Sequence, residues 1–247
     1  MSNKGLPEIP WIRIFVEGAV IVGSILLAFG IDAWWEDVGA RERDRGYLMS
    51  LRDEFGETLA HAQEQREIRD VAARSSASLI GQVQGKKRAE TDSLYLWFSL
   101  TSMPIGFIPP ISVFNDAAAS GAIQRIRQDD LRIALVQYPL LLDRLREQDE
   151  AASAVSELRL QPFLEGRVPR VERLRRGFFG GRNEYEFPFG PSSNPVDFNA
   201  VFGEPELEDM LAERWFRLMM GSVNLADVEA HLVEVISLID LELTGAE

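Results

Sequence analysis

The strongest pattern in the chain is a run of apolar residues near its start, from Ile14 to Trp35. Two acids, Glu17 and Asp32, interrupt the run near its ends. As a helix that rises about 1.5 Å per residue, the run is about 33 Å long, which matches the ~30 Å hydrocarbon thickness of a bilayer. The pattern therefore predicts a transmembrane helix over 14–35, after a tail of residues 1–13 and before a body of residues 36–247.

Two other interpretations of this run stay open. Its uninterrupted apolar part, 18–31, also suits a cleavable signal peptide, because Lys4 and Arg13 precede it and a small-x-small pattern closes it. The same run also suits a buried helix of a soluble protein. An acid at Glu17 is unusual in a signal core and the paired tryptophans at its end suit a headgroup region, so we favour the anchor. Arginines follow the run as well, and they are mixed with acids, so the side of the membrane that holds the body stays open.

Helical periodicity gives the predicted span two unlike faces. Glu17, Ser24, Ala28 and Asp32 fall within one arc of roughly 100°, and bulky apolar side chains lie opposite. Small residues let helices approach closely in lipid, and polar groups there seek protein partners, so the arc is a candidate interaction face. The alternative is a lone anchor that tolerates two acids near its ends.

The body also begins with a helical pattern. Leu48, Leu51, Phe55 and Leu59 recur at three- and four-residue intervals among charged residues, which predicts a long juxtamembrane helix from Gly39 toward Gln84. Prolines then predict a loop over 103–110 that either packs on the core of the body or faces a partner.

Three further helical regions are separated by helix breakers. Apolar periodicity predicts helices over 112–120 and from Asp129 through 164, the latter kinked at Pro139. Glycines and prolines in 165–205 exclude a long helix there, and the segment reads as an aromatic loop with a short hairpin near Arg182-Asn183. Two antiparallel helices, 206–220 and 225–243, are expected to complete a mainly α, bundle-like body with this loop as an insertion.

The opening run carries a specific motif as well. A Glu opens the run at Glu17, and the order Ile-Leu-x-Ala-x-x-Ile-Asp-x-Trp-x-Glu follows over 25–36. This motif resembles that of a family of uncharacterised bacterial single-pass membrane proteins, in which Asn is common at the position of Asp32 and Gly at that of Ser24. Similar residues continue to about position 145, including Ser120-Gly121. The resemblance implies a membrane-anchored helical domain in the bacterial cytoplasmic membrane and adds no activity.

Charge and composition narrow the classes of function. The 247 residues carry a net charge of −13, which argues against a nucleic-acid partner because such binding rests on Lys and Arg contacts to phosphates. The chain has no cysteine, so it has neither disulfides nor thiolate chemistry. Only two histidines are present, His61 and His231, and neither has a second histidine at the spacing of a zinc site. We expect no metal, no cofactor and no catalytic residue.

One dense basic cluster stands out in this acidic chain. Arginine clusters hold phosphates or carboxylates through bidentate contacts, so this one is a candidate site for an anion or a lipid headgroup. The alternative is a solvated patch paired with nearby acids. The cluster consists of Arg167, Arg170, Arg173, Arg175 and Arg176.

These observations favour a noncatalytic, membrane-anchored helical protein. We expect its partners to be the bilayer and either another protein or a second copy of the chain. The alternative hypothesis is a small-ligand sensor or an enzyme that uses the arginine cluster, 167–176, and the aromatic loop, 177–202.

Overall fold

The computed structural model describes residues 11–177 and 187–245, and it divides the chain into two compact units, Met1–Met49 and Ser50–Glu247. In the first unit, the described residues belong to helix α1, Trp11–Val83, which continues into the second unit. The predicted span and the predicted juxtamembrane helix are therefore parts of one helix. The predicted hairpin near Arg182-Asn183 and most of the N-terminal tail lie outside the described residues.

The N-terminal part of α1 is long and apolar enough to cross a membrane. None of its most apolar stretch is buried within the chain, and side chains such as Phe29 and Trp35 are more than 60% exposed. A core helix of a soluble protein would bury these side chains against its own fold, and the described chain gives them no such cover. A membrane anchor and a signal sequence are both compatible with a helix of this kind.

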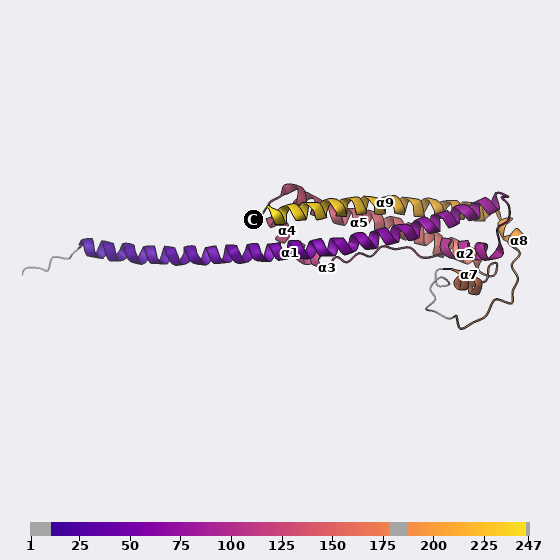
Figure 1. The fold of residues 1–247 in the computed structure, drawn as a ribbon, viewed down its shortest axis with the longest axis horizontal. Coiled ribbons are helices and arrows are strands. Elements are labelled where there is room, and N and C mark those ends of the chain that lie inside the picture. The colour runs from indigo at the N-terminus through magenta and orange to yellow at the C-terminus, as the bar shows by residue number, and fades with distance from the viewer. Residues whose placement is uncertain (1–10, 178–186, 246–247) are drawn as a thin grey trace, which may run out of the picture. The chain divides into compact units, whose positions relative to one another are not determined.

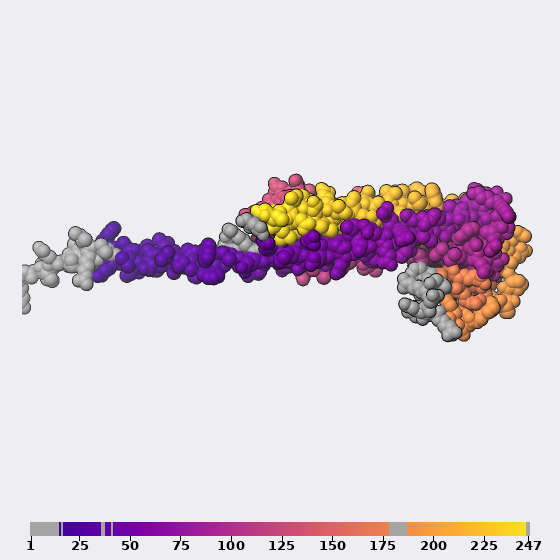
Figure 2. Space-filling view, viewed as in Figure 1, coloured from indigo at the N-terminus to yellow at the C-terminus, as the bar shows by residue number. Residues whose placement is uncertain are grey.

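Three long helices run side by side in the second unit (Figure 1). They are the later part of α1, α5 (Asp129–Val155) and α9 (Pro205–Thr244). Helix α9 is antiparallel to α1, because Arg52 pairs with Asp240 near one end and Gln84 donates to Glu208 near the other. In the space-filling view, the yellow atoms of α9 lie along the violet atoms of α1 (Figure 2). This arrangement confirms the mainly helical class that the periodicity predicts.

Short helices fill the connections between the long ones. The region from 165 to 205 holds only short helices among its described residues, as its glycines and prolines predict, and α2, α7 and α8 gather at one end of the unit (Figure 1). The short elements are α2 (Thr91–Thr101), α3 (Ser112–Ala119), α4 (Ala122–Arg125), a π-helix η1 (Ser156–Leu160), α6 (Gln161–Leu164), α7 (Arg170–Arg176) and α8 (Phe198–Phe202). Helix α5, η1 and α6 follow one another directly, which confirms the predicted extension to residue 164.

The proline-rich loop predicted over 103–110 is present and alternates between buried and exposed residues. Ile105 and Phe107 are buried, whereas Ile108 is 85% exposed. Ile105 and Phe107 therefore hold the loop on the core of its own unit, and the rest of the loop is more exposed.

The predicted pair of C-terminal helices is wrong, because α9 is one helix of 40 residues. The expected break at Gly221 does not occur. A glycine inside a helix costs only about 1 kcal/mol relative to alanine. Here Gly221 is buried where a Cβ would meet the Arg69 Nε at 3.4 Å, and Ser222 donates to Asp70 at 2.6 Å. Gly221 therefore allows a close approach of α9 to α1 rather than ending the helix.

Candidate anion-binding site

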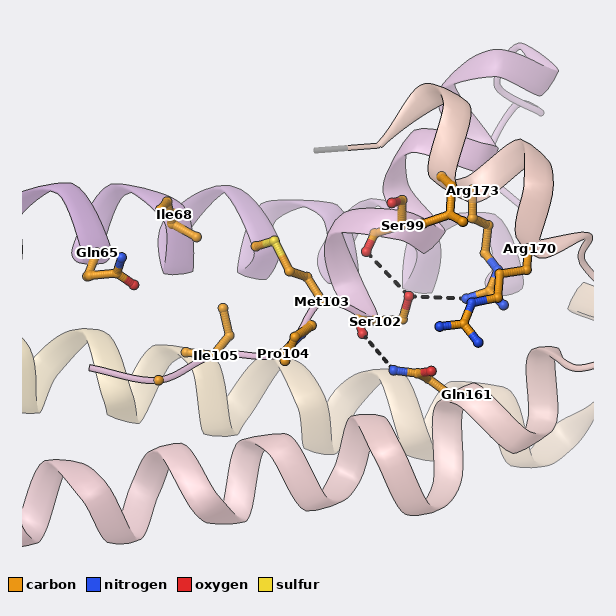
Figure 3. A pocket seen from close by; sticks show the side chains of 12 residues that line it. Gln65, Ile68, Ser99, Ser102, Met103, Pro104, Ile105, Gln161, Arg170 and Arg173 are labelled. Atoms are coloured by element: carbon orange, nitrogen blue, oxygen red, sulfur yellow. Dashed lines mark hydrogen bonds between the residues drawn. The ribbon is translucent and has the colours of Figure 1, made fainter. Parts of the chain in front are cut away.

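A cavity of about 460 Å³ lies in the second unit (Figure 3). Small-molecule sites in proteins typically have volumes of about 300–1,000 Å³. The walls come from α1, α2, the loop after α2, α6 and α7. The lining residues are Gln65, Ile68, Ser99, Ser102, Met103, Pro104, Ile105, Gly106, Gln161, Arg170, Arg173 and Leu174.

Glycine at the end of α7 allows this helix to lie against α2. Gly177 is buried, and a Cβ at this position would overlap the Ser99 hydroxyl and lie 2.6 Å from the Arg173 carbonyl oxygen. A larger residue would have to push the two helices apart. Gly177 therefore fixes the spacing between the arginines of α7 and the serines of α2.

Helix α7 presents its charged residues on two different faces. Glu172 is buried and lies 3.8 Å from Arg175 and 3.5 Å from Arg176, at the three- and four-residue spacings that place side chains together on a helix. Arg170 and Arg173 lie on another face and line the cavity. The basic cluster predicted from the sequence is thus divided between an internal ion-pair network and the cavity.

Arg173 is the buried cation of the cavity. Arg173 is only 7% exposed, and its Nη1 donates to the Ser102 hydroxyl at 3.4 Å. Its Nε has no hydrogen-bond partner among the described residues. Burial lowers the pKa of Arg173, the charge of Arg170 lowers it further, and Glu165 opposes both effects. A buried guanidinium with an unused donor favours an incoming hydrogen-bond acceptor.

The described lining of the cavity is cationic. It contains two arginines and no acidic residue. Arg170 is exposed, so the cationic end reaches the surface of the unit. The Ser102 hydroxyl already donates to the Phe98 carbonyl at 2.7 Å, and the Gln161 amide donates to the Ser102 carbonyl at 3.3 Å. The two guanidinium groups are therefore the donors that suit a carboxylate or a phosphate. The arrangement can hold an anion, and it places no described carboxylate against one.

Buried charges hold the wall that carries Ser102. Arg214 donates from Nε to the Thr101 carbonyl at 3.0 Å and from Nη2 to the Met103 carbonyl at 2.6 Å. Burial lowers the pKa of Arg214 to about 10, and Asp149 counteracts that effect, so the side chain is a cation at neutral pH. These bonds fix the backbone on both sides of Ser102.

Asp149 anchors the same wall further along. It accepts two bonds from the Arg69 Nη2, at 2.7 and 2.6 Å, and one from the Phe107 amide at 2.9 Å. Arg69 is fully buried. Helices α1, α5 and α9 thus position the 101–107 segment through two buried arginines.

The remaining parts of the predicted sites lie elsewhere. Arg167 packs on the Phe163 ring, 4.5 Å from its centroid, and does not line the cavity. In the aromatic loop, Phe198 and Phe202 stack near Phe98 in the core. Residues 178–186 lie outside the described part of the chain. No described aromatic of 177–202 lines the cavity, so the structure brings only half of the predicted ligand site together.

Both histidines pack against aromatic rings inside the helical unit. His61 is half-buried, with its ring 5.1 Å from that of Phe107. His231 is buried, its Nε2 lies 3.0 Å from the Ala134 carbonyl oxygen, and its ring stacks on Tyr138. Within the described ranges, no group of three His, Asp or Glu residues is arranged to hold a metal ion.

The candidate face of the predicted span is exposed within the chain. Glu17, Ser24, Ala28 and Asp32 are all exposed, and the Ser24 hydroxyl donates to the Val20 carbonyl at 2.7 Å. This bond satisfies the serine within its own helix, so close approach of another helix at Ser24 would bury no unpaired donor.

Sequence reasoning missed the polar wall that faces the arginines. Ser99, Ser102 and Gln161 come from α2, its C-terminal end and α6, and no local pattern joins them. One available signal was the spacing of Glu172 from Arg175 and Arg176, which separates these arginines from Arg170 and Arg173. No protein-family model, curated protein or solved structure matches the chain.

Proposed function

We propose that this protein is a membrane-anchored, noncatalytic binding protein whose helical body takes up a small anionic ligand between Arg170 and Arg173. The observation that carries the proposal is a cavity whose described lining holds two guanidinium side chains, Arg170 and the largely buried Arg173, and no acid. An anion would supply a negative charge beside the guanidinium and offset the cost of burying it. This role develops the ligand-sensor alternative and leaves a protein partner as a second component.

The apolar start of α1 supports the membrane part of the proposal. Its exposed side chains have no cover from the chain itself, and a bilayer would remove them from water. We propose a single-pass anchor in a bacterial cytoplasmic membrane, and a self-association face at Glu17, Ser24, Ala28 and Asp32. The small, internally satisfied Ser24 favours close helix contact there.

Calorimetric titration of the full chain in discs of neutral lipid tests anion binding. The probes are inorganic phosphate, sulfate, acetate and hexanoate. We expect saturable binding of at least one probe, and the variants Arg173→Gln and Arg170→Gln should weaken it by about 10–150-fold, the loss expected for a charged hydrogen bond of 1.5–3 kcal/mol. Because Arg170 is exposed, its replacement tests the site even where replacement of Arg173 disturbs folding.

Arg175→Gln is the matched control, because Arg175 belongs to the same helix but pairs with Glu172 outside the cavity. It should keep the affinity of the unaltered chain. The proposal is wrong if none of the four probes binds, or if Arg175→Gln weakens binding as much as Arg173→Gln does.

A further inference from the structure

The cavity has two chemically different ends. Ser99, Ser102, Gln161 and the two arginines gather at one end, and apolar side chains, with Gln65 beside them, occupy the other (Figure 3). The apolar end is formed by Ile68, Met103, Pro104 and Ile105. Each end comes from several elements, so the division belongs to the folded unit rather than to one helix.

The apolar end is continuous with the core of the unit. Ile105 is part of a buried cluster with Ala72, Ala73 and Leu218, and Ile68 and Met103 pack against this cluster. Their positions are therefore fixed by packing, and the cavity does not depend on mobile surface side chains. A wholly polar ion such as phosphate would leave this wall without a partner.

We infer that the ligand is an amphiphilic anion, with a carboxylate or phosphate head at Arg170 and Arg173 and a short apolar tail along Ile68, Met103 and Ile105. This inference rests on the proposed anion-binding function and specifies its ligand class. The head pairs with the guanidinium groups of Arg170 and Arg173, and the tail covers the apolar wall. Neither a neutral alcohol nor a purely inorganic anion uses both ends.

The test is a series of alkyl carboxylates, acetate, butyrate and hexanoate, titrated into the full chain in neutral-lipid discs. Burial of one methylene in an apolar site tightens binding by roughly fourfold, so hexanoate should bind up to about 200-fold more tightly than acetate. Hexanol should bind at least tenfold more weakly than hexanoate because it lacks the charge. Heats from partitioning into the lipid are removed by subtracting the same titration of Arg173→Gln.

Variants of the apolar end separate the tail from the head. Ile68→Ala and Met103→Ala should reduce the gain per methylene while acetate affinity stays unchanged. Ile133→Ala is the matched control, because Ile133 is 53% exposed on α5 and does not line the cavity. It should leave the whole series unchanged.

The possible outcomes distinguish this inference from the proposed function. Equal, Arg173-dependent affinities for acetate, butyrate and hexanoate would overturn the amphiphilic ligand and leave anion binding intact. Absence of binding for every anion would overturn both. Repeating the hexanoate titration in discs that contain phosphatidic acid shows whether the ligand's anionic head belongs to a lipid. Weaker hexanoate binding in these discs would mean that the lipid competes for the site, and an unchanged affinity supports a water-soluble anion of the same class.

Discussion

Removing the charge of Asp149 should strongly destabilise the body. Asp149 is the acidic partner that the structure gives to the fully buried Arg69, and it also accepts the Phe107 amide. The substitution Asp149→Asn keeps the size of the side chain and removes its negative charge. Arg69 would then be a buried cation without its counterion, next to the equally buried Arg214.

The expected loss is large compared with the stability of a domain. Breaking a buried ion pair by removing one partner costs about 3–5 kcal/mol, whereas a whole domain is stable by roughly 5–15 kcal/mol. Asn has one acceptor oxygen where Asp149 uses both, so it cannot hold Arg69 and the Phe107 amide in the same way. The 101–107 wall of the cavity should therefore loosen, and anion affinity should fall with stability. Asp143→Asn is the control, because its pair with Arg146 is more than half exposed on both sides and should contribute little.

Urea unfolding of the full chain in detergent micelles, followed by circular dichroism, measures this loss. The unfolding midpoint of Asp149→Asn should fall markedly while the dependence on urea stays constant. The double variant Arg69→Met with Asp149→Leu should recover part of the stability, because it removes both charges of the pair but leaves the Phe107 amide and Arg214 without Asp149. A loss below about 1 kcal/mol for Asp149→Asn would refute the reasoning, since the pair would then behave like an exposed one.

Three further predictions concern the cavity and the anchor. Gly177→Ala should cost about 1–3 kcal/mol and weaken hexanoate binding by separating α7 from α2, whereas Gly190→Ala, with no atom near its added Cβ, should do neither in the same melting and titration assays. Hexanoate affinity should be constant from about pH 6 to 9, because the lowered pKa of Arg173 is still that of a guanidinium and its proton is lost only as pH rises far above neutral; a decline across this range would indicate a histidine site. Since the chain has no native cysteine, Ser24→Cys should form oxidative dimers in membranes and Leu26→Cys, on the opposite face, should not; equal crosslinking would exclude a preferred face.

Local periodicity predicted the helices well, because an amphipathic stripe records which side chains are buried. The end of α1 near Gln84 and the start of α5 at Asp129 follow from that pattern. The prediction of two C-terminal helices failed at Gly221, because a glycine that allows close helix packing cannot be distinguished in sequence from one that ends a helix. The continuity of α9 through Gly221 depends on its packing against α1, and local sequence patterns do not report such packing.

The candidate site was only partly predictable for a similar reason. The density of arginine in 167–176 predicted the cationic end of the cavity, but it did not show which of the five arginines line the cavity. Burial of Arg173 depends on Gly177 and on α2, and the apolar end depends on residues such as Ile68 that are far away in the chain. These relations arise from tertiary packing and have no local signature.

The central claim is that an anion binds beside the guanidinium groups of Arg170 and Arg173. The most direct measurement is the NMR spectrum of the arginine Nε–Hε groups in the ¹⁵N-arginine-labelled full chain, with the Arg173 signal assigned through Arg173→Lys. Addition of hexanoate should shift the Arg173 signal in the direction of a stronger hydrogen bond and leave that of Arg175 unchanged. An unchanged Arg173 signal at saturating hexanoate would contradict the account.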